Sequence, residues 1–274
     1  MLSGYNDCHR RAIAHQFGTE IRSVGFELNT TKSSVGASLG TATHKVIERF
    51  FNSFINSENF NQQSAVDDAI SEFKENTKEG VIWDDATPNI DVLVMQTNRM
   101  ATAYIETIGK TVKPVATEVS LKADINETWL LSGHVDLICK NADSEVDNIH
   151  VRDLKTGKLS RSHHNQLGAY SLLVKHNNYS DVKVAAIDFL KRCPKTKPQE
   201  LPVTTKYKVS VCEGSAWFTI QHIIENDEKF IKNLNPLHIP DNSMSMMCSE
   251  KYCCAYGTDF CSTTKYKEVV KEEK

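Results

Sequence analysis

Residues 151–158, VRDLKTGK, end a predicted strand with an acid and a base that stand two positions apart. Because side chains alternate along a strand, Asp153 and Lys155 point to the same face. Two interpretations follow from this pattern. The pair is either an ion pair on a solvated strand end or a metal-binding carboxylate with an ammonium group beside it, and the rest of the chain has to decide.

The stretches around VRDLKTGK predict a mixed α/β core. Runs rich in β-branched residues alternate with runs in which apolar residues recur at helical spacing. The predicted elements are strands 114–121, 128–139 and 148–155, helix 162–177, strands 182–192 and 206–212, and helix 216–234. This order predicts an α/β fold with a mixed central sheet flanked by helices.

The first hundred residues predict a helical N-terminal addition. Helical spacing recurs at 42–55, 64–73 and 91–108, and a loop that contains Pro88 separates the last two segments. The first segment carries one apolar stripe, formed by Val46, Ile47, Phe50, Phe51 and Phe54.

Length and composition are those of an ordinary globular protein. The 274 residues are 40% hydrophobic and 24% charged, which suits a single domain with a large core. We expect a mainly helical part (1–112), an α/β core (113–235) and a cysteine-rich end (236–274).

The net charge of −3 argues against passive coating of nucleic acid but allows a locally basic groove. The first residues contain no long apolar run, so we expect a cytoplasmic protein without a secretory signal or membrane span.

Acidic residues on neighbouring predicted strands point to a metal site. If strands 128–139 and 148–155 pair as a hairpin, the carboxylates of Asp136 and Asp153 converge, and Glu118 on the preceding strand is a candidate third carboxylate. Oxygen ligands of this kind suit Mg²⁺ or Mn²⁺. The ammonium of Lys155 would then orient an attacking water and offset charge on a phosphate.

Residues on two predicted helices extend this candidate site. Gln166 and Tyr170 are four positions apart and therefore share a helix face. His44 lies on the helix that spans 42–55, in phase with Ile47 and Phe51. Each of these residues alone is typical of a surface amide, an amphipathic core position or a structural histidine, so only their combination favours a site.

The ordered series His44, SGHVDLI (132–138), RDLKTGK (152–158) and QLGAY (166–170) resembles the RecB-like branch of the PD-(D/E)xK nuclease superfamily. The resemblance covers nearly the whole chain and implies a restriction-endonuclease-like core. It implies that Mg²⁺ or Mn²⁺ is bound by His44, Asp136, Asp153 and the carbonyl of Leu154. It also implies that Lys155 is the catalytic lysine, and that Gln166 and Tyr170 position the scissile strand. The surface ion pair is thus the weaker interpretation.

Eight cysteines form a second signature. Three of them, Cys139, Cys193 and Cys212, are typical of buried small residues. In AddB-like and CRISPR-associated members of the branch, one cysteine before the histidine helix and three near the C-terminus hold a [4Fe–4S] cluster. The resemblance implies the same role for Cys8, Cys248, Cys253 and Cys261, with Cys254 as the alternative to Cys253. The spacing is wider than is usual in the family, so zinc or no metal at all are the competing interpretations.

These features predict a metal-dependent deoxyribonuclease. We expect an exonuclease that acts on single-stranded DNA or DNA ends in recombination, repair or phage DNA processing. The alternative is a non-catalytic subunit that binds DNA ends and retains the fold. The chain has no G-x-x-x-x-G-K-[ST] motif, so any unwinding would need a separate helicase or recombination protein. Basic stretches at 155–161 and 191–197 are candidates for phosphate contact.

Overall fold

A computed structural model describes residues 2–141, 148–156, 163–179 and 181–261. Backbone packing divides the chain into two compact units. The core unit is Ser33–Gly214, and the terminal unit combines Met1–Lys32 with Ser215–Lys274.

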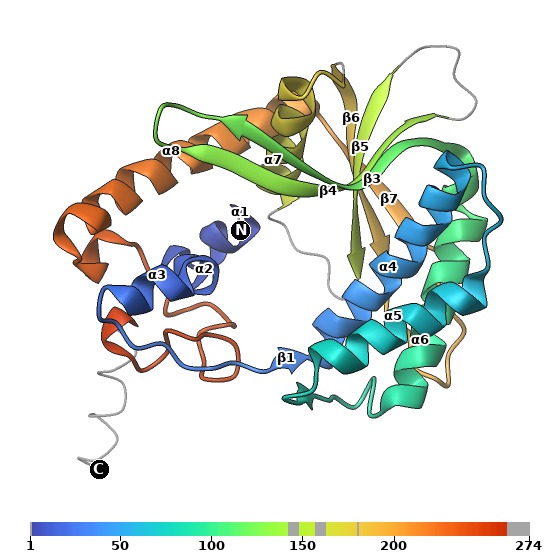
Figure 1. The fold of residues 1–274 in the computed structure, drawn as a ribbon, viewed down its shortest axis with the longest axis horizontal. Coiled ribbons are helices and arrows are strands. Elements are labelled where there is room, and N and C mark those ends of the chain that lie inside the picture. Colours follow the sequence, from blue (N-terminus) through green and yellow to red (C-terminus); the bar gives the residue numbers. More distant parts are fainter. Residues whose placement is uncertain (1, 142–147, 157–162, 180, 262–274) are drawn as a thin grey trace. The chain divides into compact units, whose positions relative to one another are not determined.

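A five-stranded mixed sheet forms the centre of the core unit (Figure 1). Its strands follow the order β3 (Val112–Asp124), β4 (Leu130–Asn141), β5 (Ile149–Thr156), β6 (Val182–Leu190) and β7 (Val203–Tyr207). All neighbours are antiparallel except β5 and β6, which are parallel. Parallel strands need a crossover connection, and α7 (His163–His176) lies between β5 and β6 in the sequence. The predicted mixed α/β core is confirmed.

Helices cover both faces of this sheet. Along β5, Leu154 packs into a core cluster with residues of α4 (Val35–Ile55), α5 (Gln62–Asn76) and α6 (Ile90–Glu106). Val151, on the opposite face of the strand, packs instead with Leu173 and Val174 of α7. Strands that are apolar on both faces are typical of a sheet enclosed between helices.

The helical N-terminal part of the core unit is confirmed. Side chains of Ser34, Asn61 and Asn89 accept backbone hydrogen bonds and cap α4, α5 and α6 at their N-termini. Short strands β1 (Ser33–Ser34) and β2 (Val81–Ile82) pair in parallel nearby, and η1 (Ile108–Thr111) leads into β3.

One residue of the predicted stripe on α4 is placed differently. Val46, Ile47 and Phe51 are buried as expected, whereas Phe54 is 56% exposed. The prediction for Phe54 was wrong because this residue lies in the last turn of a helix that ends at Ile55.

The predicted strand at 206–212 is also wrong in its second half. β7 ends at Tyr207, and α8 (Val209–Asn233) begins two residues later, earlier than the predicted helix. The alternation of residue types in KYKVSVC (206–212) resembles the pattern of a strand. The buried positions that follow recur instead every three or four residues, at Cys212, Ala216, Ile220 and Ile223.

The terminal unit brings both ends of the chain together. It contains α1 (Leu2–Asp7), α2 (His9–Gln16), α3 (Gly18–Ser23), most of α8, η2 (Pro236–His238) and η3 (Asp259–Cys261). The rings of Phe26, Phe230 and Phe260 pack against one another in this unit. Among the helices that the structure describes in either unit, none combines the length and apolarity needed to cross a bilayer.

Candidate active site

Three carboxylates form a row across neighbouring strands of the core unit. Glu118 on β3 and Asp136 on β4 occupy facing positions, because their neighbours in the two strands are paired, Thr117 with Leu137 and Val119 with Val135. Asp153 on β5 continues the row, one position beyond the last pair of β4 and β5, Leu137–Arg152. Facing residues of antiparallel strands have neighbouring side chains, so strand register by itself brings these acids together.

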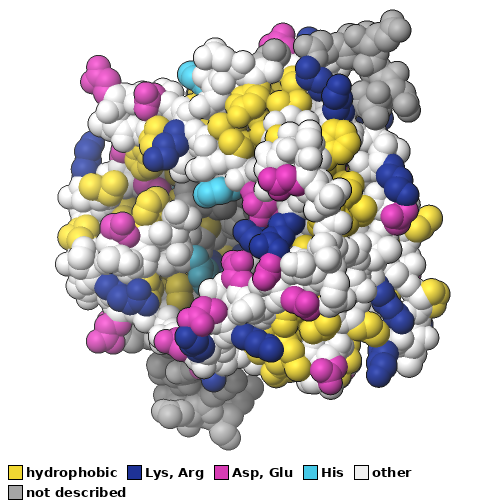
Figure 2. All heavy atoms as spheres, turned by 45° about the vertical axis from the view of Figure 1, so that its right-hand side comes forward, with side chains coloured by type: hydrophobic (Ala, Val, Ile, Leu, Met, Phe, Trp, Pro, Cys, Tyr) yellow, Lys and Arg dark blue, Asp and Glu magenta, His cyan; other side chains and the backbone are white. Residues whose placement is uncertain are grey.

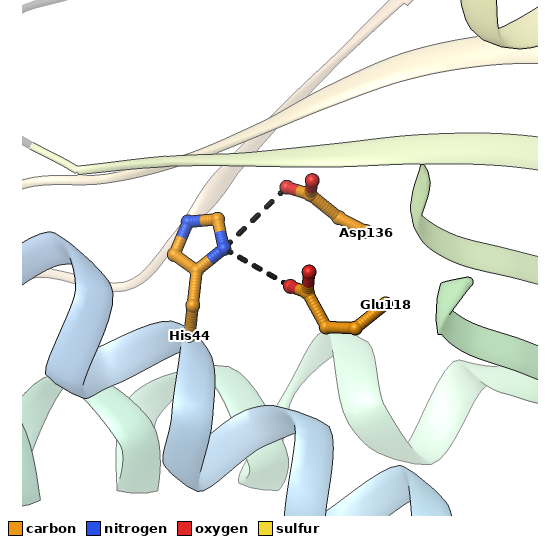
Figure 3. Close-up of side chains that lie close together, drawn as sticks. All are labelled: His44, Glu118 and Asp136. Carbon is orange, nitrogen blue, oxygen red and sulfur yellow. Dashed lines mark ion pairs between the residues drawn. The ribbon is translucent and has the colours of Figure 1, made fainter. Parts of the chain in front are cut away.

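His44 on α4 completes this carboxylate site. Its Nδ1 lies 3.5 Å from Oε1 of Glu118 and 3.5 Å from Oδ2 of Asp136 (Figure 3). One ligand atom from each of the three residues lies within 4.8 Å of the other two, close enough to share a metal ion. One turn before His44, Gly40 lets the helix approach β5, since a Cβ there would lie only 2.6 Å from Oγ1 of Thr156.

Asp153 and Lys155 form a close pair beside this group. Nζ of Lys155 lies 2.9 Å from each carboxylate oxygen of Asp153. Oδ1 accepts a hydrogen bond from Nζ, whereas Oδ2 is buried and accepts none from the residues that the structure describes. The backbone of Leu154 also reaches the site, because its N–H donates to Oδ2 of Asp136 at 2.9 Å. A buried carboxylate oxygen whose contact is an ion pair, without a hydrogen bond, keeps lone pairs for a cation.

Burial and mutual repulsion disturb the titration of the site. Burial, and then the charge of Asp136, raise the pKa of Asp153 to about 7. Burial also raises the pKa of Asp136, against the opposing effects of His44 and Lys155. Burial lowers the pKa of His44, but the charges of Asp136 and Glu118 outweigh it and raise the pKa overall. A bound divalent cation would favour the ionised carboxylates, so the ligand set fits Mg²⁺ or Mn²⁺.

The backbone of β3 is distorted at the site. Glu118 has a φ of +46°, which is uncommon for a residue other than glycine. The side chain of the preceding residue, Thr117, donates to the carbonyl of Asp136 at 2.9 Å. Strained backbone of this kind persists where the surrounding structure holds it, often at functional sites.

Gln166 and Tyr170 of α7 lie on the same helix face and contact each other. Nε2 of Gln166 donates to the hydroxyl of Tyr170 at 2.9 Å. Burial and the charges of Asp136 and Asp153 raise the pKa of Tyr170, so its hydroxyl lies within electrostatic range of the carboxylates. The residues predicted from the sequence are therefore brought together, whereas Gly157 of the D-x-K-T-G pattern lies outside the described residues.

Comparison with known proteins identifies the family. A family model for the PD-(D/E)XK nuclease superfamily matches residues 1–256. The chain belongs to this superfamily. No curated protein matches the chain by sequence. A solved structure from Eubacterium rectale, provisionally assigned as an exonuclease, is 13% identical; the match covers 80% of this chain and 74% of that one, with a TM-score of 0.41.

Sequence reasoning missed Glu48, a further acid at this superfamily site. Glu48 lines the same small cavity as His44, Glu118 and Asp136, and it forms an ion pair of 3.1 Å with Lys45. Its position four residues after His44, on the same face of α4, is the signal that could have identified it.

A buried ion pair beneath the site was also missed. Arg152, the neighbour of Asp153, donates two hydrogen bonds to Asp188 of β6, at 2.8 and 2.6 Å. The hydroxyl of Tyr104 on α6 donates to the same carboxylate at 2.9 Å. These partners are distant in the sequence, so no local pattern could have revealed them. They fix the strand that carries Asp153 and Lys155.

Four cysteines line one cavity of the terminal unit, which we call the cysteine pocket: Cys8, Cys248, Cys253 and Cys261. Cys254 is buried but does not line it. Burial raises the pKa of Cys253 to about 12, and Cys254, Cys261 and Cys8 add to the effect. A buried thiol with a raised pKa, such as that of Cys253, becomes a thiolate only beside a cation. Four cysteines around one cavity fit an iron–sulfur cluster or zinc.

Two of the four cationic residues in the predicted basic stretch 191–197 are ion-paired. Lys191 is paired with Glu200, and Arg192 with Asp84 at 2.9 Å. The other stretch, 155–161, lies mostly outside the described residues. Figure 2 shows Lys and Arg side chains scattered among Asp and Glu over the face that it draws.

Proposed function

We propose that the protein is a Mg²⁺- or Mn²⁺-dependent deoxyribonuclease, an exonuclease that acts on single-stranded DNA or DNA ends. The observation that carries this proposal is the convergence of His44 with the carboxylates of Glu118 and Asp136, next to the Asp153–Lys155 pair. Membership of a nuclease superfamily supports hydrolysis of a phosphodiester bond.

His44, Asp136, Asp153 and the carbonyl of Leu154 would hold the metal ion, with Glu118 as a further ligand. The metal, when bound, supplies an activated water and stabilises the leaving oxygen. The buried Oδ2 of Asp153 and the short distance between His44 and the carboxylates support this ligand set.

Lys155 would orient the attacking water and offset charge on the scissile phosphate, because an ammonium in a preorganised site stabilises a developing anion. Gln166 and Tyr170 would position the DNA strand. Their hydrogen bond to each other orients both polar groups before substrate arrives.

We also propose that the cysteine pocket holds a [4Fe–4S] cluster, with zinc as the alternative. Its support is that the four predicted ligands line one cavity and that Cys254 does not. The cluster would join the two ends of a chain that works as one nuclease domain, in recombination, repair or phage DNA processing. A separate helicase or recombination protein would supply any unwinding.

Incubation of the purified protein with end-labelled single- and double-stranded DNA, with Mg²⁺, Mn²⁺ or chelator, tests the nuclease. We expect mononucleotides or short products only with metal, and no cleavage by Asp136→Ala or Asp153→Ala, because each loses a metal ligand. Asp124→Ala, at an exposed position of β3, is the matched control and should cleave normally.

The outcomes separate the candidate functions. Full cleavage by Asp153→Ala would exclude the proposed site. DNA-end binding by the wild type without cleavage in any metal would favour the non-catalytic subunit. Iron analysis of protein purified without oxygen tests the cluster separately, and one zinc per chain without iron would favour the zinc site.

A further inference from the structure

Arg11, which no motif singled out, points a polar group toward the cysteine pocket. It lines the same cavity as the four cysteines. Cys8 is the N-cap residue of α2, and Arg11 is the third residue of that helix. The Nε of Arg11 is buried and donates no hydrogen bond to any described residue. A buried guanidinium N–H without an acceptor is costly, and its position calls for an explanation.

The rest of the guanidinium group is held in place. Nη2 of Arg11 donates to Oδ2 of Asp7 at 2.8 Å. The same oxygen accepts from the hydroxyl of Ser245 at 2.7 Å, and Nδ2 of Asn242 donates to the carbonyl of Asp7 at 2.8 Å. Asp7 thus fixes one edge of the guanidinium to the segment that precedes Cys248, whereas the buried Nε has no acceptor among the described residues.

Arg11 is the one cationic side chain among the described residues that line the cavity, and it is ion-paired with Asp7. Asp241 also lines the cavity, but it forms an ion pair of 3.3 Å with Arg10. The carboxylate of Asp241 is therefore neutralised by Arg10, which does not line the cavity. Four thiolates would bring a large negative charge to this place, and a fixed cation beside them would stabilise it.

We propose that Arg11 is a positioning residue of the thiolate metal centre, whose Nε donates a hydrogen bond to a cluster or cysteine sulfur and compensates its negative charge. This inference rests on the proposed cluster. Hydrogen bonds to sulfur and nearby charge set the potential of iron–sulfur clusters. A donor and a positive charge stabilise the reduced, more negative cluster, so Arg11 raises its reduction potential.

Anaerobic protein reconstituted with ferrous iron and sulfide provides the test. Iron per chain is measured first, and the reduced fraction is then followed by electron paramagnetic resonance in a dye-mediated redox titration. In Arg11→Met we expect the usual iron content but, at a given potential, a ratio of reduced to oxidised cluster that is about tenfold lower, equivalent to about 59 mV for a one-electron couple. Arg11→Lys, which keeps the charge but loses the planar donor, should shift less, in the same direction.

Arg22→Met is the matched control. Arg22 is another arginine of the terminal unit whose charge acts on Cys254, but it does not line the cysteine pocket. Its loss should leave the potential unchanged. If Arg11→Met does not retain iron, the reduction potential of the Arg11→Lys variant is compared with that of the wild type instead.

The possible failures are distinguishable. Iron-loaded Arg11 variants with the potential of the wild type and of Arg22→Met would overturn the role of Arg11 alone. Absence of iron in the reconstituted wild type would overturn the cluster and this inference together, whereas DNA cleavage by the carboxylate site would be unaffected.

Discussion

The carboxylate site and the cysteine pocket are built by opposite means. Glu118, Asp136 and Asp153 stand on adjacent strands, and backbone register aligns them. Cys8 and Cys248 belong to segments far apart in the sequence, and among the described residues of the terminal unit no strand pairing joins these segments.

Side chains next to Cys8 hold its segment against the C-terminal part of the terminal unit instead. Nε2 of His9 lies 3.1 Å from Oδ1 of Asp227 in α8, and both residues are buried. Arg10 donates to the carbonyls of Pro236 and Ile239, each at 2.8 Å. A site carried by a sheet is therefore aligned by strand pairing, whereas a site formed by the chain ends needs side-chain hydrogen bonds and ion pairs of its own, which we call the polar clamp. A bound cluster would reinforce this clamp.

Substitution of single cysteines tests most directly whether a cluster holds the terminal unit together. Cys8→Ser, Cys248→Ser and Cys261→Ser should each abolish the broad absorption near ~400 nm of anaerobically purified protein. They should also lower the free energy of unfolding by roughly 2–4 kcal/mol, as loss of a cross-link that closes a long loop does. Absorption spectra and thermal melts measure both effects.

Two control variants belong to the cysteine experiment. Cys212→Ser alters a fully buried cysteine of the core unit and should keep the colour, whatever its effect on stability. Cys254→Ser should also keep it, because Cys254 does not line the pocket. Bleaching in Cys254→Ser but not in Cys253→Ser would reverse the ligand assignment.

Loss of Lys155 should affect the other site without any change in colour. We expect Lys155→Ala to retain metal and DNA binding but to cleave on the order of 10² more slowly, because one preorganised cationic group is lost. Single-turnover cleavage and isothermal titration with Mn²⁺ measure the two properties. Lys122→Ala, at an exposed position of β3, is the control, and an unchanged rate in Lys155→Ala would remove this lysine from the mechanism.

Tyr170→Phe should have a smaller effect on the same site. The variant keeps the ring, which lies close to Gly133 and packs in a core cluster, but it loses the hydroxyl that accepts from Gln166. We expect cleavage to fall about tenfold, as for one lost polar contact, with an unchanged melting temperature. Gln166→Ala should have a similar effect; two unaffected variants would contradict a role in positioning the strand.

A further prediction is a pH dependence of stability in metal-free protein. The pKa of Asp153 rises on folding from 3.8 to about 7, so the folded state holds its proton more tightly. The stability that this group contributes is therefore present below about pH 4 and is lost as the pH rises through 7. Melting temperatures in chelator from pH 5 to 8 should fall less steeply for Asp153→Asn, and an equal slope in both proteins would contradict this.

Most of the core architecture could be predicted from local patterns. Strands β3 to β6 and helices α5 to α7 of the core unit fall close to the predicted ranges, because alternation and helical spacing there reflect burial on a sheet or a helix face. Helix α4 ends where predicted but begins at Val35, earlier than the predicted start at residue 42. The strand predicted at 206–212 failed because alternation over a few residues also fits the start of an amphipathic helix, and packing of Cys212 decided between them.

The chemical groups that are available, and their order along the chain, can be read from the residues alone: the D-x-K pair, the acids before it, the helix with Gln166 and Tyr170, and the cysteines at both ends. That Glu118 faces Asp136 and that Glu48 lines the same cavity follows only from the folded structure. It also decided that Arg11 lines the cysteine pocket, whereas Cys254 does not. The physical reason is that local patterns report burial within one element, whereas convergence of side chains depends on strand register and on packing between distant segments.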